Sequence, residues 1–181
     1  MLQPNFTPFP GIKTARLELL ALETAHAPDM FALRTNLQAM QYLGKPIPTS
    51  IDEIYPLLAT IKTAVNENTG ITWGIKLQSK NAIIGTMGFH KIYTQHYRAE
   101  IGYMMLPEFW GNGYMSEVME AVLKYAFETL KLHSIEAVVE PNNEKSIALL
   151  TKFGFVKEAH FRENYCLNGV FSDTAVYSLI R

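Results

Sequence analysis

Hydrophobic residues recur with two different periods along the first third of the chain. They alternate with polar residues over positions 15–22, which predicts a half-buried β-strand. Positions 25–35 are predicted as a helix, whereas 36–48 contain glycine and proline breakers and are predicted to be irregular. A Ser-x-x-Glu capping box that starts at Ser50, with apolar residues at helical spacing after it, predicts a second helix over 51–67.

The middle of the chain shows strand periodicity followed by the strongest helical pattern. Strands are predicted over 71–77, 82–91 and 98–105, in an order typical of an antiparallel meander. Beyond the glycines at 111 and 113, apolar residues follow i, i+3, i+4, i+7 spacing and predict a long amphipathic helix. These residues are Met115, Val118, Met119, Val122, Tyr125, Ala126 and Leu130.

The last third is predicted as short strands around one helix, with a hairpin at its end. The strands span 134–139, 155–162, 165–167 and 170–179. The helix covers 143–153 and ends at Gly154. Asn168-Gly169 is the strongest short signal for a type I′ turn, so it predicts the hairpin.

The composition is typical of a globular protein without a charged binding surface. The 181 residues are 48% hydrophobic and 18% charged, with a net charge of -1 and scattered basic residues, which argues against stable nucleic-acid or membrane binding. The N-terminus lacks a secretory pattern, Cys166 is the single cysteine, and the histidines lack metal-ligand spacing. We therefore expect one cytoplasmic domain over 1–181, with 1–13 as an extended lead and no metal.

The most informative motif is the loop with Gly111 and Gly113, between a predicted strand and the strongest helix. Such a loop exposes backbone N–H groups at the positive end of a helix and can hold a phosphate, although a plain turn would need no ligand. Tyr114 and Met115 stand where a Walker loop needs Lys and Ser or Thr, and Ser116 where a Rossmann fingerprint needs glycine. Both of these nucleotide motifs are therefore excluded.

Linked motifs in a fixed order carry a resemblance to a known family. They are AEIGY at 99–103, LPEFWGNGYMSE at 106–117, PNNEKSI at 141–147 and KFGF at 152–155, with TARL at 14–17 near the start. On these motifs the chain resembles the GNAT N-acetyltransferases, and within them the RimJ/RimL-like branch that acts on ribosomal proteins. The resemblance implies an α/β (α+β) domain with a mixed, mostly antiparallel sheet of six to seven strands and about four flanking helices.

The resemblance also implies acetyl-CoA as the acetyl donor. The loop from 111 to 116 is expected to receive the pyrophosphate, and the strand at 103–106 to splay from its neighbour and bond the pantetheine, unless Met104 and Met105 only pack. The residues expected against the coenzyme are Met104, Met105, Leu106, Gly111, Asn112, Gly113, Tyr114, Met115, Ser116, Asn143, Ser146 and Phe153. Asn112 stands where relatives often carry Lys, Arg or Gln, and Met115 where Ala or Gly is usual; the backbone donors remain.

Acetyl transfer needs a deprotonated amine, a polarised thioester carbonyl and a proton for the departing thiolate. Because a free alkylamine has a pKa of roughly 10, a carboxylate is a sensible base. Glu100, a charge inside a predicted strand, is the first candidate unless it is a surface glutamate, and Glu158 is the second. Many relatives carry a tyrosine acid where this chain has Leu150, so Ser146 is the expected hydroxyl near the sulfur, with Asn143 also serving as a helix N-cap.

The acceptor is expected to contact segment 36–48 and hairpin 163–169. Aromatic residues are candidates for its walls: Phe89, Tyr93, Tyr97, Phe161 and Tyr165. We expect a monomeric or homodimeric enzyme that acetylates a primary amine of a small molecule or a protein N-terminus directly. Alternatives are a polyamine or aminoglycoside acceptor, a non-catalytic acyl-CoA-binding regulatory module, and a nucleotide-binding protein that uses the same loop.

Overall fold

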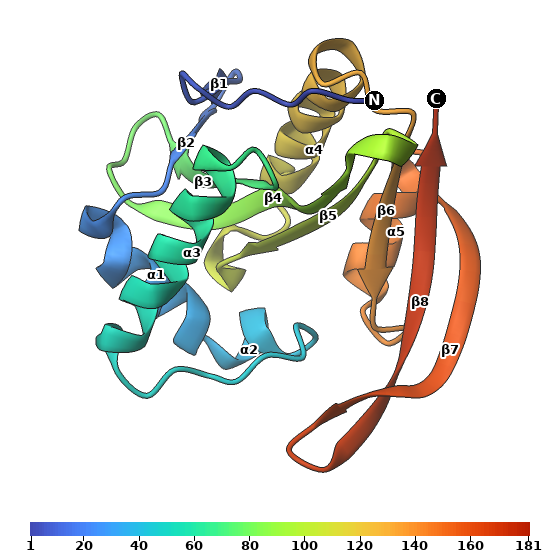
Figure 1. The fold of residues 1–181 in the computed structure, drawn as a ribbon. Coiled ribbons are helices and arrows are strands. Elements are labelled where there is room, and N and C mark those ends of the chain that lie inside the picture. The colour runs from blue at the N-terminus through green and yellow to red at the C-terminus, as the bar shows by residue number, and fades with distance from the viewer.

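An eight-stranded sheet runs through the computed structural model, which describes residues 1–181 (Figure 1). The strand order is β1-β2-β3-β4-β5-β6-β8-β7, and β5 and β6 form the one parallel pair. The strands are β1 (Ile12–Lys13), β2 (Leu17–Ala21), β3 (Ile71–Leu77), β4 (Ile83–Tyr93), β5 (Arg98–Met105), β6 (Ser134–Val139), β7 (Val156–Leu167) and β8 (Val170–Ile180). The predicted mixed, mostly antiparallel sheet is confirmed, with one strand more than the six to seven expected.

Five α-helices cover the two faces of this sheet. They are α1 (Ala27–Thr35), α2 (Leu37–Met40), α3 (Ile54–Asn66), α4 (Tyr114–Lys124) and α5 (Glu144–Lys152). Helices α1, α2 and α3 share one hydrophobic cluster with Met104 of β5, whereas α4 and α5 pack into the main core around Trp73 (Figure 1). We call these sides of the sheet the α3 face and the α4 face.

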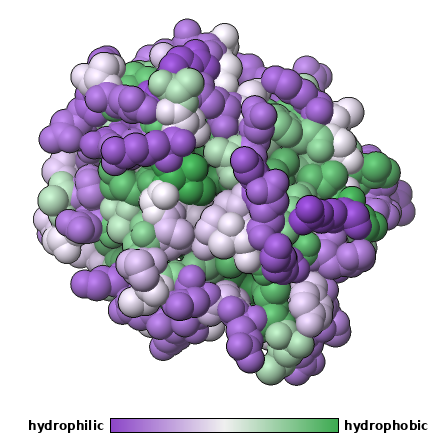
Figure 2. All heavy atoms as spheres, turned by 90° about the horizontal axis from the view of Figure 1, so that it is seen from above, coloured by the Kyte–Doolittle hydropathy of each residue, from purple (hydrophilic) through white to green (hydrophobic).

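The main core is built around the fully buried Trp73. Its ring meets those of Phe9, Phe89 and Tyr125 edge-on, at centroid distances of 6.3, 6.2 and 5.5 Å. The prediction of Phe89 as an acceptor wall is therefore wrong, because its side chain is 0% exposed inside this core. Seen from above, hydrophobic residues show largely in hollows between hydrophilic side chains (Figure 2).

Local sequence signals predicted the type and approximate position of most elements. The bounds of β3, β5 and β6 match the prediction, and both hydrogen bonds of the Ser50–Glu53 capping box are present. The two elements that periodicity missed, β1 and α2, are too short to show a repeat: β1 has two residues, and α2 is one turn capped by Asn36. The strands predicted at 155–162 and 165–167 form one strand, β7, with irregular pairing between them.

The strands β5 and β6 separate soon after they meet. They pair only where Arg98 to Glu100 lies beside Ser134 to Glu136, and the rest of β5 bonds to β4 alone. This is the splay that was expected near 103–106. None of the helices has the length and apolar content that crossing a membrane requires.

Candidate acetyl-transfer site

A pocket of about 1130 Å³ opens beside the end of β5, where that strand has left β6. Its walls come from α2 and the residues after it, the end of β5, the glycine loop with the start of α4, and α5. Most residues predicted for the coenzyme line it: Met104, Met105, Gly111, Gly113, Tyr114, Met115, Ser116, Asn143 and Ser146. Leu106 and Phe153 instead pack against the hydrophobic clusters, and Asn112 lies outside the lining. Because α2 and α5 lie on opposite faces, the pocket reaches both sides of the sheet.

The glycine loop presents a row of free backbone donors to this pocket. Gly111 and Gly113 have φ angles of 76° and 75°, in the left-handed region that favours glycine. No N–H group from Gly111 to Ser116 bonds to another group of the protein, and the first helical bond runs from the N–H of Glu117 to the carbonyl of Gly113, at 3.1 Å. A helix start with unbonded N–H groups is suited to holding an anion.

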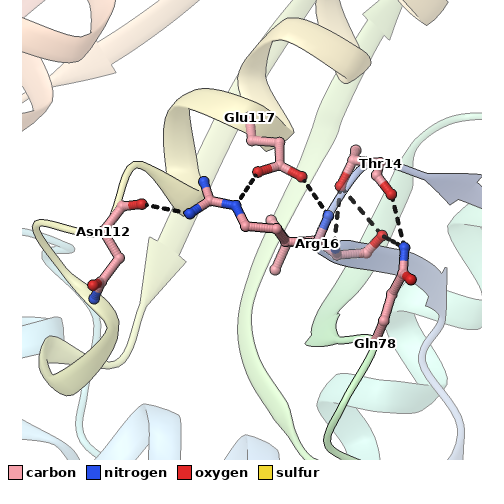
Figure 3. Close-up of polar contacts among 6 residues, drawn as sticks. Thr14, Arg16, Gln78, Asn112 and Glu117 are labelled. Carbon is pink, nitrogen blue, oxygen red and sulfur yellow. Dashed lines mark hydrogen bonds and ion pairs between the residues drawn. The ribbon is translucent and has the colours of Figure 1, made fainter.

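Arg16 holds this loop from the far end of the sequence (Figure 3). Its backbone N–H and Nε donate to the carboxylate of Glu117 at 2.8 and 2.7 Å, and Nη1 donates to the carbonyl of Asn112 at 2.9 Å. In a planar trans peptide the carbonyl and the following N–H point in opposite directions. The bond to Asn112 therefore turns the N–H of Gly113 away from Arg16.

The contacts of Glu117 favour its ionised, carboxylate form. Burial raises its pKa, but hydrogen bonds from Thr14 and Arg16 and the charge of Arg16 lower it more, so the net shift is downward. The segment before Arg16 is itself held, because Gln78 Nε2 donates to the carbonyl of Thr14 at 2.7 Å (Figure 3). Arg16 and Glu117 lie 101 residues apart, so no local pattern could indicate their contact.

A pair of hydroxyl groups spans the splay. Tyr103 Oη lies 2.7 Å from Ser146 Oγ, and burial raises the pKa of Tyr103 to about 12. Asn143 accepts the backbone N–H of Ser146 at 3.1 Å, which confirms its N-cap role in α5. Leu150 is fully buried, so a hydroxyl at that position would face the core. Sequence reasoning missed Tyr103 because it lies 43 residues from Ser146, on another element.

Glu100 is on the α3 face of β5, with Gly102 and Met104 following it on that side. Its carboxylate accepts from Lys91 Nζ at 2.9 Å, which raises the pKa of Lys91, and it is not part of the pocket lining. A bulge in β4 places His90 on the same face, where its imidazole lies against Gly102. Sequence reasoning also missed His90, because the bulge that turns it toward Gly102 has no local signal.

The second carboxylate candidate lies elsewhere: Glu158 is exposed on β7. The two candidates for the base therefore lie on different strands, Glu100 on β5 and Glu158 on β7, and each can be tested by its own substitution.

A model of the acetyltransferase (GNAT) domain matches residues 16–156. The chain belongs to the GNAT acetyltransferase family. This confirms the predicted family and fold, and it makes the protein an N-acetyltransferase with acetyl-CoA as its donor.

Relatives of this GNAT acetyltransferase span nearly its whole length. The uncharacterized N-acetyltransferase YoaA of Bacillus subtilis is 40% identical over 173 residues, which are 96% of this chain and 98% of YoaA. The spermidine N(1)-acetyltransferase of Vibrio cholerae is 29% identical over 88% of this chain and 90% of its own. The structure of RimL, a ribosomal-protein alpha-N-acetyltransferase in complex with coenzyme A, matches with a TM-score of 0.85 at 25% identity, over 94% and 98% of the two chains.

Besides Arg16, the cations near the glycine loop of this GNAT acetyltransferase come from α5 and not from position 112. Lys145 lines the pocket with its Nζ 4.2 Å from the ring centroid of Trp110, and Lys152 Nζ donates to Ser116 Oγ at 3.1 Å. The side chain of Asn112 instead donates to loop carbonyls. Asn112 thus shapes the loop, and positive charge is supplied from a distant part of the sequence.

The two segments predicted to surround the acceptor meet in the structure. Tyr165 of β7 donates through its hydroxyl to the carbonyl of Gly44, and its ring is packed on that glycine. Three of the other aromatic candidates, Tyr93, Tyr97 and Phe161, are exposed and lie outside the pocket lining.

Proposed function

We propose that this GNAT enzyme transfers the acetyl group directly to a primary amine that approaches from the α3 face. The observation that carries the proposal is the position of the pocket. It has the free N–H groups of the glycine loop along one part and the Tyr103–Ser146 pair at the splay, so one molecule can contact both. Relatives named as spermidine and ribosomal-protein acetyltransferases support an amine acceptor.

The residues of the pocket fit coenzyme A by their chemistry. The backbone N–H groups from Gly111 to Ser116 would hold the pyrophosphate at the start of α4, with Lys145 and Lys152 nearby. The backbone of Met104 and Met105 lies on the edge of β5 that faces the splay, so it can bond the pantetheine amides as a neighbouring strand would. The coenzyme supplies the activated acetyl group.

The proposed base and the hydroxyl near the sulfur lie on different elements, Glu100 on β5 and Ser146 on α5. Glu100, directly or through water, takes a proton from the amine, whose nitrogen forms a bond to the acetyl carbon as the carbon–sulfur bond breaks. The hydroxyl of Ser146 donates a hydrogen bond to the departing sulfur, which leaves as a thiolate and takes up its proton from solvent. In the proposed arrangement Tyr103 is the donor in its 2.7 Å hydrogen bond with Ser146 Oγ, which orients the Ser146 hydroxyl.

Replacing Tyr103 with phenylalanine tests this orientation. We expect kcat to fall roughly tenfold, which corresponds to the loss of a hydrogen bond that contributes about 1.4 kcal/mol. The KM for acetyl-CoA should be nearly unchanged. Steady-state kinetics with a saturating amine measures both constants. An unaltered kcat would show that Ser146 needs no partner, and a Ser146→Ala enzyme provides the comparison.

Replacing Arg16 with glutamine tests the support of the loop. Loss of its bond to the carbonyl of Asn112 frees the peptide that orients the N–H of Gly113, so we expect the KM for acetyl-CoA to rise about three- to tenfold with little change in kcat. Arg16→Lys keeps the charge but loses the forked geometry of the guanidinium. Its KM for acetyl-CoA should lie between those of the wild type and Arg16→Gln. A KM equal to that of the wild type would mean that the loop holds its shape without Arg16.

The function itself is tested by release of free thiol from acetyl-CoA with a panel of amines. The panel contains peptides with free N-termini, spermidine and an aminoglycoside, and mass spectrometry identifies the acetylated product. We expect thiol release that depends on an amine. Tight binding of coenzyme A without turnover on any member would contradict the proposed function.

A further inference from the structure

Arg34, a cation on the α3 face, has no anionic partner. Arg34 of α1 is half-buried, and no carboxylate lies within 4.0 Å of its guanidinium. Its one polar contact is a weak bond from Nη1 to Met40 Sδ at 4.0 Å. Withdrawal from water lowers the pKa of Arg34. Partly buried charges are normally paired, so this guanidinium is suited to receive an anion.

Arg34 contacts the segment that forms the α2 wall of the pocket, because Met40 stands between Ala39 and Gln41, which line it. Met40, which it touches, belongs to the same hydrophobic cluster as Met104, and Met104 lines the pocket. Gly102 is on the same face two residues earlier in β5, and the imidazole of His90 lies against it. Arg34 and His90 therefore both contact elements that contribute to the pocket, α2 and β5, on the α3 face.

The charges around these contacts are more positive than negative. Glu100 is paired with Lys91, and Glu136, its neighbour across the β5–β6 pair, is paired with Arg98. Lys45 has no carboxylate partner, as is the case for Arg34. The two carboxylates beside the β5–β6 pair are therefore already matched, whereas Arg34 and Lys45 have no carboxylate within 4.0 Å.

The pKa of His90 depends on the charges of the same residues. Its pKa is lowered, first by desolvation, and the charges of Arg34, Lys45 and Lys91 lower it further, whereas Glu100 raises it. Arg34, Lys45 and Lys91 thus all contribute to the electrostatic environment of this imidazole.

We propose that Arg34, assisted by Lys45, binds a carboxylate of the acceptor, so that the acetylated amine belongs to an amino acid or a peptide with an acidic residue near its N-terminus. This inference rests on the proposed function and selects among its acceptors. A polyamine, which carries several positive charges and no anion, would meet unmatched cations here. A guanidinium instead forms paired, charge-assisted hydrogen bonds with a carboxylate.

The experiment compares matched acceptors with wild-type and Arg34 variants. Peptides with aspartate or glutamate at the second or third residue are paired with the same peptides carrying asparagine or glutamine, and spermidine is the cationic control. We expect the wild type to have a KM roughly tenfold lower for the acidic peptides. Arg34→Gln should remove that preference, Arg34→Lys should keep part of it, and Arg34→Glu should favour spermidine.

Matched controls separate binding from loss of structure. Lys62→Gln removes an exposed cation from α3, on the same side of the sheet, and should leave the preference intact. The KM for acetyl-CoA should be unchanged in every Arg34 variant, which shows that the coenzyme site is intact. Equal KM values for acidic and neutral peptides, or a preference for spermidine in the wild type, would overturn the inference and leave the proposed function standing. Absence of turnover on every amine would contradict the proposed function instead.

Discussion

Replacing Gly113 with aspartate is expected to weaken the binding of coenzyme A on the order of a hundredfold. The residue has a φ of 75° at the start of α4, among backbone N–H groups that have no partner in the protein. A carboxylate there would occupy the space of the pyrophosphate and repel it, and it would cancel the positive end of the helix dipole. Isothermal titration with coenzyme A measures the dissociation constant.

Asparagine at the same position is the matched control. It has nearly the size of aspartate and tolerates positive φ, but it carries no charge. We expect Gly113→Asn to lose far less affinity than Gly113→Asp. An aspartate variant that binds coenzyme A as well as the wild type would remove this loop from the coenzyme site, and equal losses in both variants would assign the effect to shape.

Replacing Glu100 with glutamine is expected to lower kcat by about a hundredfold, since general-base catalysis contributes roughly 10²- to 10⁴-fold. The affinity for coenzyme A should stay near that of the wild type, because Glu100 is not part of the pocket lining. The pairing of Glu100 with Lys91 at 2.9 Å would also be lost. Steady-state kinetics and titration with coenzyme A separate the two effects.

Glu158→Gln is the matched comparison, since this carboxylate is exposed on β7 and was the second candidate for the base. We expect it to retain the wild-type rate. The reverse pattern, with Glu100→Gln active and Glu158→Gln inactive, would move the base to β7. A Lys91→Met enzyme then shows how much of any change comes from the broken ion pair alone.

The sequence by itself determined the features that depend on neighbouring residues. Strand patterns located β3, β5 and β6, and the capping box at Ser50 and the N-cap at Asn143 form as predicted. The glycine loop was also recognisable, because positive φ and a helix start are set by the few residues around Gly111 and Gly113. Such features arise from hydrogen bonds and torsional preferences within one or two turns of chain.

Only the tertiary structure decided which distant groups meet. The bonds of Arg16 to the glycine loop and of Tyr103 to Ser146 join residues 101 and 43 positions apart. The lack of an anionic partner for Arg34 depends on which side chains fold toward it. Such contacts are set by the packing of helices against a sheet, in which burial and charge sum over the whole domain, so no local period encodes them.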